Sequence, residues 1–480
     1  MTAQSLLPRW FPAIYLLGLG ILVTTCSFNG LYGQDAHEYV RQCQVILQRW
    51  QGLPTPAPGI GDAELAGGYP LAGALLGRMT GNVPGALQWV SMLSAALTCL
   101  VFERLLRLLS PGSRVESRWI FTGLGLSMAP LFLRAALTVM SDAFGMLLLL
   151  SVFLFGLGSL EKKNAWFLPL AVLLGAFAVS TRYALVALVL PIYIWLGWNA
   201  LKENRWLVLG CSVLAGILGL WPHFWLKLGG SSIPLGHSLL QDWSLWHFLQ
   251  SSFNTLSGQV AYTFPNALYL LFPLAHPGFL LHLPLLFLLW KKTDIMLSEK
   301  KMLLVCLLTY LLLLGGLPHQ NLRYLLPVYL ILLLLLFPAW DRMYCYGLIF
   351  FRKITLGLIA VTMAVQLFFC TRTLWPVLHR NHLELEIATR LQEQLPAGAT
   401  LYAFDLEPAM RTYLTKVNIR SLWEQRYVTF ESGAYILFKE SLRSQWEGKA
   451  PVQNWDTLRA QHQLEEKAGF AEGWVLWEIR

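Results

Sequence analysis

The sequence predicts an α-helical polytopic membrane protein with about eleven transmembrane helices, followed by a small C-terminal α/β domain. Three observations support this fold class. The chain of 480 residues is 56% hydrophobic and only 13% charged, whereas soluble domains carry about 25% charged residues. Apolar stretches recur along the chain up to residue 371. From residue 372 onward charged residues are frequent, and helical and strand-like patterns alternate.

A helix needs about 20 apolar residues to cross the hydrocarbon core of a bilayer. The predicted spans are 10–28, 85–109, 119–133, 143–160, 165–180, 183–199, 206–226, 267–290, 302–317, 324–340 and 354–371. The first span also resembles a signal peptide, but Thr25 is bulkier than a cleavage site favours, and many more spans follow. We therefore interpret it as a retained helix.

The basic residues predict the orientation of these spans. If the N-terminus is cytosolic, one set of loops carries 16 Lys and Arg residues and the other set carries seven, which fits the excess of positive charge on cytosolic loops. An odd number of spans then places the C-terminal domain outside the cytoplasm. Residues 1–371 have a net charge of +10 and residues 372–480 a net charge of −1. Because the basic residues are spread over membrane loops, no nucleic-acid partner is expected.

These patterns divide the chain into a transmembrane domain, 1–371, and an extracytoplasmic soluble domain, 372–480. Within the soluble domain the sequence predicts helices at 382–395 and 454–468 and strands at Thr400–Phe404, Ala434–Phe438 and Trp474–Ile479.

Acidic residues on the predicted outer side are candidates for catalysis. Asp35 lies just after the first span, where it either caps the following amphipathic helix or serves as a catalytic acid or base. Asp142 follows Ser141 at the outer start of a span, and a cap is again the alternative. Glu64 lies in a Gly- and Pro-rich loop, where a solvated side chain is the default. Glu38 and Arg41 are three residues apart and are expected to form a local ion pair.

Two arginines lie at matching outer ends of predicted spans. Arg182 occupies a short turn between two spans, and Arg323 precedes a span that begins near Pro327. Each is either an interfacial arginine that extends to the membrane surface or part of an anion site suited to a phosphate. His319 is a lone histidine, which is more often structural, and Asp405 follows a strand, where an ordinary loop is the simpler interpretation. The sequence contains no zinc-ligand spacing, phosphate-binding glycine loop or nucleophile elbow.

Five motifs in this order carry a family resemblance. They are Gly33-Gln34-Asp35-Ala36-His37-Glu38-Tyr39, Gly68-Tyr69-Pro70-Leu71-Ala72-Gly73-Ala74-Leu75, Leu137-Thr138-Val139-Met140-Ser141-Asp142, Ser180-Thr181-Arg182-Tyr183-Ala184-Leu185 and Leu322-Arg323-Tyr324-Leu325-Leu326-Pro327. Their succession resembles bacterial glycosyltransferases of the GT-C fold, and more narrowly the protein O-mannosyltransferase and lipid A aminoarabinose transferase group. The resemblance covers most of residues 1–345.

The resemblance implies an enzyme of the bacterial plasma (inner) membrane that transfers a sugar, usually with inversion, from a polyprenyl phosphate to an acceptor outside the cytoplasm. It implies Asp35 as the catalytic base. Arg323, Arg182 and Tyr324 would contact the donor phosphate. The residues that would supply a second acid or line the site are Glu64, Asp142, Glu38, His37 and His319.

The sequence departs from the protein O-mannosyltransferases at one informative position. There a glutamate directly follows the aspartate, whereas here Ala36 follows Asp35. The kind of envelope acceptor and the use of a divalent metal (Mg or Mn, with Glu64 as candidate ligand) therefore stay open.

Two other functions compete with this hypothesis. A flippase or transporter of lipid-linked sugars would also need membrane lipids and a polyprenyl-linked partner, but transporters tend to show internal repeats and charged helices near the midplane. A non-catalytic subunit of an envelope assembly would tolerate substitution of Asp35.

Overall fold

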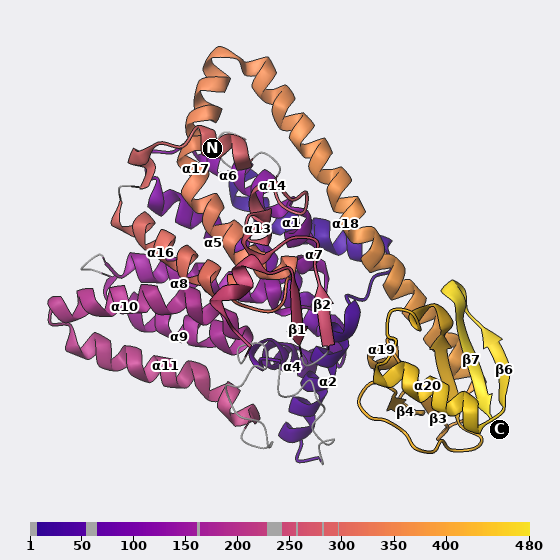
Figure 1. Ribbon diagram of the computed structural model, residues 1–480. Coiled ribbons are helices and arrows are strands. Elements are labelled where there is room, and N and C mark those ends of the chain that lie inside the picture. Colours follow the sequence, from indigo (N-terminus) through magenta and orange to yellow (C-terminus); the bar gives the residue numbers. More distant parts are fainter. Residues whose placement is uncertain are drawn as a thin grey trace. The chain divides into compact units, whose positions relative to one another are not determined.

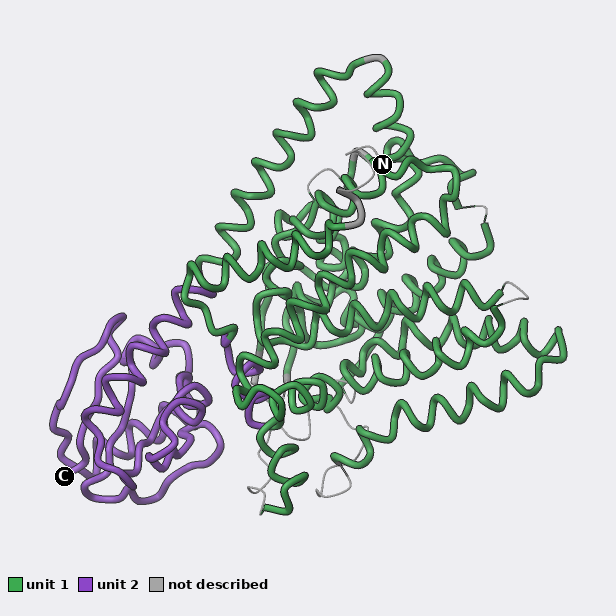
Figure 2. The backbone as a smooth tube through the Cα atoms, turned by 180° about the vertical axis from the view of Figure 1, so that it is seen from behind, with its two compact units in different colours: residues 1–30, 42–375 green, residues 31–41, 376–480 purple. Residues whose placement is uncertain are grey.

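The computed structural model describes residues 7–53, 65–160, 164–227, 242–255, 258–280, 283–295 and 297–480 (Figure 1). The chain forms two compact units (Figure 2). Unit 1 comprises Met1–Gly30 and Gln42–Trp375, and unit 2 comprises Leu31–Arg41 and Pro376–Arg480. Two helices, α2 (Gly33–Trp50) and α18 (Arg352–Gln394), contribute residues to both units.

Unit 1 is a helical bundle with one small hairpin. Its other α-helices are α1 (Leu7–Thr25), α4 (Gly68–Thr80), α5 (Val83–Leu109), α6 (Val115–Phe121), α7 (Pro130–Leu137), α8 (Ser141–Gly158), α9 (Phe167–Thr181), α10 (Val186–Lys202), α11 (Trp206–Lys227), α13 (Asn266–Tyr269), α14 (Phe272–Ala275), α15 (Leu283–Leu288), α16 (Ser298–Gly315) and α17 (Leu326–Phe350). A π-helical turn (Thr122–Ser127) follows α6, and 3₁₀ turns precede α10 (Tyr183–Leu185) and α17 (Leu322–Leu325). The antiparallel hairpin consists of β1 (Ser252–Thr255) and β2 (Gly258–Ala261).

The apolar helices confirm the predicted class of an α-helical membrane protein. Within the described ranges, six helices are long and apolar enough to cross a membrane, or seven if a bent pair is taken as one span. Two shorter apolar helices, Trp10–Thr25 and Phe167–Thr181, lie where two further spans are predicted. The total of about eleven spans stays a prediction.

Two predicted spans are not the single straight helices expected from their composition. The segment 119–133 is bent by 72° between Val115–Ser127 and Pro130–Leu137, because Pro130 cannot continue the preceding helix and starts a new one. The segment 267–290 contains the three short helices α13, α14 and α15 instead of one. Pro273 lies at the start of α14, where its missing N–H costs no hydrogen bond.

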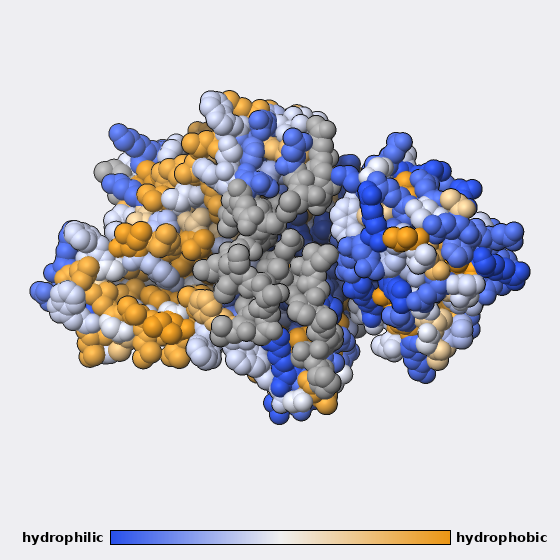
Figure 3. All heavy atoms as spheres, turned by 60° about the horizontal axis from the view of Figure 1, so that its bottom comes forward, coloured by the Kyte–Doolittle hydropathy of each residue, from blue (hydrophilic) through white to orange (hydrophobic). Residues whose placement is uncertain are grey.

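The bundle has a buried centre, and many of the exposed side chains on its outside are apolar. Helix α8 packs against α5 and α9. Of its apolar 18-residue stretch 72% is buried, whereas only 17% of the corresponding stretch of α18 is buried. Gly219 of α11 allows close packing on α9, because a Cβ there would lie 2.7 Å from the Cβ of Ala176. Exposed apolar side chains form broad areas on this unit in Figure 3, where hydrophilic residues predominate on the C-terminal unit.

Unit 2 is an α/β unit built on a five-stranded sheet. Its strands are β3 (Thr400–Ala403), β4 (Asn418–Ser421), β5 (Tyr435–Lys439), β6 (Leu464–Gly469) and β7 (Trp474–Ile479), and they lie in the order β4-β3-β5-β7-β6. Strand β3 pairs in parallel with β4 and β5, whereas β7 pairs antiparallel with β5 and β6.

Helices cover both faces of this sheet. Because side chains alternate along a strand, Leu401 packs with the end of α18 and with α19 (Glu407–Tyr413), while Tyr402 packs with α20 (Ala450–Gln461) on the other face. Between residues 376 and 480, all of which the structure describes, Val428 is the one large hydrophobic side chain that is highly exposed. Such a surface is typical of a soluble domain.

The predicted helix 454–468 is wrong in its second half. Helix α20 ends at Gln461, and the residues from Leu464 onward form β6, which pairs with β7 from Leu464↔Ile479 to Gly469↔Val475. The segment is rich in residues that favour helices, but pairing with a buried strand outweighs this local preference.

Candidate functional site

A short extended segment places Asp142 at the start of α8. Helix α7 ends at Leu137, and Thr138 and Met140 have extended backbone conformations. The N–H of Val139 donates to the Gly30 carbonyl at 2.7 Å, and Gln88 donates to the Leu137 carbonyl at 3.2 Å. These bonds satisfy the backbone between the two helices, so the position of Asp142 in the first turn of α8 is well defined.

The motif that begins at Gly68 links this segment to the end of α9. The hydroxyl of Tyr69 lies 2.8 Å from that of Ser91, which in turn donates to the Met140 carbonyl at 3.2 Å. Gly68 lies against the end of α9, since a Cβ there would be only 2.9 Å from the Ser180 carbonyl oxygen. Motifs that are far apart in the sequence therefore meet in unit 1.

Each of the two arginines lies at or next to a 3₁₀ turn that precedes a long apolar helix. Arg182 separates α9 from the 3₁₀ turn before α10, in an extended conformation. Arg323 lies in the 3₁₀ turn before α17, where the Asn321 side chain accepts a hydrogen bond from its N–H at 3.1 Å. A tyrosine, Tyr183 or Tyr324, follows each arginine.

Asp142 joins the two arginines in one buried cluster. Its Oδ1 accepts from Arg182 Nη1, and its Oδ2 accepts from Arg323 Nε at 2.9 Å. The side chains of Asp142, Arg182 and Arg323 are 1%, 8% and 16% exposed. One carboxylate thus balances two guanidinium groups, and the cluster keeps a net charge of +1. Arg323 is its most accessible member.

Aromatic side chains surround this arginine cluster. The Tyr324 ring centroid lies 5.5 Å from the Arg182 guanidinium carbon, which is a cation–π contact. His319 contacts the Tyr324 ring and hydrogen bonds to the Tyr262 hydroxyl at 3.0 Å. Tyr310 donates to the Tyr324 carbonyl at 3.1 Å. The predicted residues His319 and Tyr324 therefore lie beside the arginines.

The predicted residues of the first motif lie in unit 2. Asp35 is half-buried in the first turn of α2. Glu38 and Arg41 form the expected local ion pair, with Arg41 Nε donating at 2.9 Å. His37 is buried between Glu384 and Thr412. Because Asp35 belongs to unit 2 and the arginines belong to unit 1, their convergence in one site stays a prediction.

The described residues do not support a metal site. Among them, no three His, Cys, Asp or Glu side chains are grouped in a way that suits a metal ion. Glu64, the predicted candidate ligand, lies outside the described residues.

The structure also reveals contacts that the sequence did not predict. Asp142 is the counter-ion of both arginines, whereas its helix-cap role is not realised through a side-chain hydrogen bond. In unit 2, Arg380 binds both Glu384 and Asp405. The i, i+4 spacing of Arg380 and Glu384 was the one sequence signal for this second group, although Arg380 lies just before the predicted helix 382–395.

The apolar helical bundle followed by an α/β unit, together with the solved structures that it resembles, shows a membrane protein of the GT-C fold. Two solved structures share this fold, both of ArnT from Cupriavidus metallidurans. The structure bound to undecaprenyl phosphate has a TM-score of 0.64 and 14% identity, and the apo structure a TM-score of 0.63 and 15% identity. Each comparison covers 97% of both chains. No protein-family model and no curated protein matches the sequence.

Proposed function

We propose that this protein is a membrane glycosyltransferase that moves a sugar from a polyprenyl-phosphate-linked donor to an acceptor in the bacterial cell envelope. The observation that carries the proposal is the arginine cluster. Two guanidinium groups from different parts of the chain share one buried carboxylate and keep a net positive charge beside apolar helices. The fold likeness to ArnT, which was crystallised with undecaprenyl phosphate, supports a lipid phosphate as the anion.

The arginine cluster suits the phosphate of a lipid-linked donor. Arginine presents planar donors that match phosphate oxygens, and it stays charged when partly buried. Asp142 hydrogen bonds to one edge of each guanidinium. These bonds restrict rotation of the two side chains and so fix the direction of their remaining N–H donors. Arg323 is the most accessible of the three and would meet the phosphate first.

The proposed reaction needs a base and a means to stabilise the leaving group. An acceptor hydroxyl attacks the anomeric carbon of the donor sugar and forms the new glycosidic bond as the bond to the phosphate oxygen breaks. In the proposed mechanism Asp35 takes the hydroxyl proton, and attack opposite the leaving group inverts the anomeric carbon. Arg182 and Arg323 balance the charge that develops on the departing phosphate.

The location follows from the charge pattern of the sequence. In this proposal the N-terminus is cytoplasmic and the helices cross the inner membrane. The arginine cluster and the C-terminal α/β unit then lie on the extracytoplasmic side. A polyprenyl carrier stays in the membrane, so a phosphate site at the outer helix ends is within its reach.

The decisive experiment replaces the proposed base. Cells lacking the protein are complemented with wild type, Asp35→Asn or the control Asp456→Asn, and their envelope glycans and lipids are compared by mass spectrometry. Asp456 is a half-exposed aspartate in unit 2 that pairs with Arg443 at 2.8 Å. We expect Asp35→Asn to lose the transferred sugar while membrane levels stay normal, and Asp456→Asn to behave as wild type.

This experiment and a transport assay separate the competing functions. A normal product from Asp35→Asn would remove the proposed base and favour a non-catalytic assembly subunit. For a flippase, reconstituted protein would move the lipid-linked sugar across the bilayer with no release of sugar from its carrier.

A further inference from the structure

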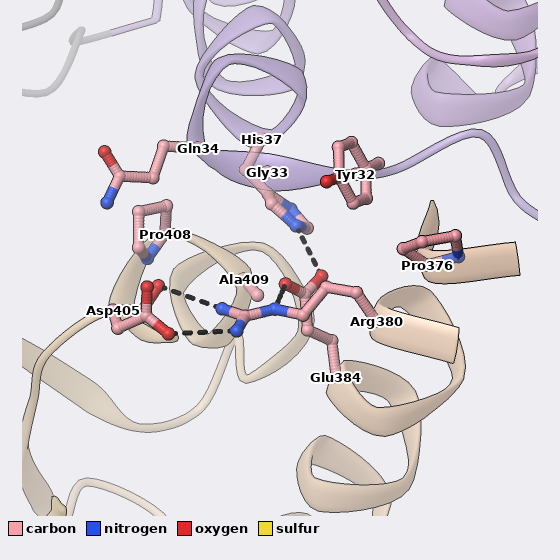
Figure 4. Close-up of a pocket in the computed structure, with 10 residues that line it drawn as sticks. All are labelled: Tyr32, Gly33, Gln34, His37, Pro376, Arg380, Glu384, Asp405, Pro408 and Ala409. Atoms are coloured by element: carbon pink, nitrogen blue, oxygen red, sulfur yellow. Dashed lines mark hydrogen bonds and ion pairs between the residues drawn. The ribbon is translucent and has the colours of Figure 1, made fainter. Parts of the chain in front are cut away.

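Unit 2 contains a pocket that the proposed arginine site does not use. It has a volume of about 250 Å³ and lies between the first turn of α2, the unit 2 part of α18 and the segment leading into α19 (Figure 4). All its lining residues belong to unit 2. The polar ones are Tyr32, Gln34, His37, Arg380, Glu384 and Asp405.

A chain of charged contacts forms one wall of this pocket. His37 Nε2 lies 3.2 Å from Glu384, which accepts from Arg380 Nε at 2.7 Å. Arg380 Nη1 then donates to Asp405 at 2.9 Å. Figure 4 shows the Arg380 side chain between the two carboxylates. The inner pair is almost fully buried, whereas Arg380 and Asp405 are 27% and 32% exposed. The inner residues therefore hold Asp405 in place at the accessible end.

The backbone of Asp405 is held in an unusual conformation. Its φ angle is +64°, which non-glycine residues adopt rarely. Arg380 also donates to the Asp405 carbonyl at 3.4 Å. Residues held in such conformations are often found at binding sites, where the surrounding structure offsets the strain. Here the strained residue presents a carboxylate at the pocket.

The charges in the pocket select against an anion. Arg380 is the one Lys or Arg side chain in the lining, and its guanidinium is already shared by Glu384 and Asp405. With His37 neutral, the lining has a net charge of −1. Carboxylate and amide groups hydrogen bond well to hydroxyls. The apolar lining residues, Pro376, Pro408 and Ala409, offer a surface for the C–H groups of a ring.

We propose that this pocket binds one monosaccharide ring of the acceptor, with Asp405 and Gln34 as hydrogen-bonding groups. The inference rests on the proposed function, because it gives the C-terminal unit a role in choosing a carbohydrate acceptor. Pockets for drug-sized ligands have volumes of about 300–1,000 Å³. A pocket slightly below that range suits a single sugar ring.

Direct binding of free sugars tests this proposal independently of transfer. The full-length protein in detergent is mixed with millimolar glucose, galactose, mannose, glucosamine or N-acetylglucosamine, and bound sugar is detected by saturation-transfer NMR. We expect at least one sugar to bind the wild type. Asp405→Asn keeps the shape of the side chain but removes its charge, and we expect it to weaken binding about tenfold.

A second variant and a control guard against effects on folding. Gln34 is exposed and lines the pocket, so Gln34→Trp is expected to block binding without disturbing the Arg380 contacts. Asp456→Asn, away from the pocket lining, should bind as wild type does. Thermal unfolding of each variant shows whether unit 2 stays folded.

Three outcomes would overturn the proposal: binding of none of the sugars, equal binding in wild type and Gln34→Trp, or displacement of a bound sugar by millimolar inorganic phosphate. The last outcome would make the pocket an anion site. Failure of the proposed function gives a different result, because an Asp35→Asn variant that still makes the normal product, or a wild type that transfers no sugar, leaves sugar binding in this pocket unchanged.

Discussion

The polar clusters of unit 1 and unit 2 have opposite arrangements of charge. In unit 1, one carboxylate, Asp142, serves two guanidinium groups and leaves a net charge of +1. In unit 2, one guanidinium, Arg380, serves two carboxylates and leaves a net charge of −1. Burial also differs, because the central Asp142 is 1% exposed and the central Arg380 is 27% exposed.

The difference indicates what each cluster is suited to bind. A buried charge needs a partner of opposite sign, so the excess positive charge of Asp142, Arg182 and Arg323 taken together favours an anion such as a phosphate. The uncompensated carboxylate in unit 2 disfavours anions and suits hydroxyl groups instead. A glycosyltransferase with a phosphate-linked donor and a carbohydrate acceptor needs one site of each kind.

The largest expected effect comes from removing the centre of the unit 1 cluster. Asp142→Asn removes the carboxylate that two buried guanidinium groups share, and we expect it to destabilise the protein by about 3–5 kcal/mol. The corresponding change Asp405→Asn affects a partly exposed pair and is expected to cost about 1 kcal/mol or less. Denaturant unfolding of the purified proteins measures both. Equal losses in the two variants would contradict the difference in burial between the clusters.

The next effect concerns the anion site itself. Arg323→Gln removes the most accessible positive charge of the cluster, and we expect affinity for undecaprenyl phosphate to fall about tenfold or more. Arg323→Lys keeps the charge but loses the planar pair of donors, so its affinity should fall less. Arg107, exposed on α5, provides the control Arg107→Gln. Unchanged affinity in Arg323→Gln would break the link between the cluster and a lipid phosphate.

Part of this comparison could be predicted from the sequence. Arg182 and Arg323 each precede a tyrosine at the outer start of a predicted span, and an anion site was one of the two interpretations that the sequence left open for them. The structure confirms that they lie together. For Asp142 the sequence left a helix cap and a site-lining acid as alternatives, because an acid in a first helical turn is explained by the helix dipole alone. Its position on the same side of the membrane as two costly arginines was the signal that it neutralises them.

The pocket of unit 2 could not be predicted. His37 and Glu384 are 347 residues apart and come from segments whose patterns predict only amphipathic helices. Asp405 follows a strand, as loop residues commonly do, and its left-handed backbone has no signature in the sequence. Likewise the helix predicted through residue 468 depended on local preference, whereas pairing of β6 with β7 is a long-range contact. Local patterns predict elements, but contacts between distant segments decide where side chains converge.

A smaller effect tests how tightly the unit 1 cluster is packed. A Cβ on Gly145 would lie 3.2 Å from Cδ of Arg182, so Gly145→Ala must displace that side chain slightly. We expect a destabilisation of about 1–3 kcal/mol and a severalfold weaker affinity for undecaprenyl phosphate. Gly210→Ala on α11 is the matched control, since a Cβ there meets nothing within 4 Å. A Gly145→Ala protein with normal affinity would show that the position of Arg182 is not critical.

The smallest effect concerns a second buried acid in unit 2. Burial raises the pKa of the Glu407 carboxyl above its ordinary value, and the Arg411 guanidinium opposes part of this shift. A carboxyl with a raised pKa in the folded state is favourable while protonated, so its contribution to stability is full at low pH and is lost as the pH rises through that pKa. Glu407→Gln stays neutral at every pH and can still accept a hydrogen bond from Arg411. We therefore expect its unfolding temperature to match the wild type near pH 4 and to exceed it by a few degrees at pH 8.

Glu386→Gln, at an exposed position on α18, controls for the loss of one carboxylate. A gain from Glu407→Gln that is largest at low pH would show that the ionised Glu407 carboxylate stabilises the folded state, contrary to the effect of its burial.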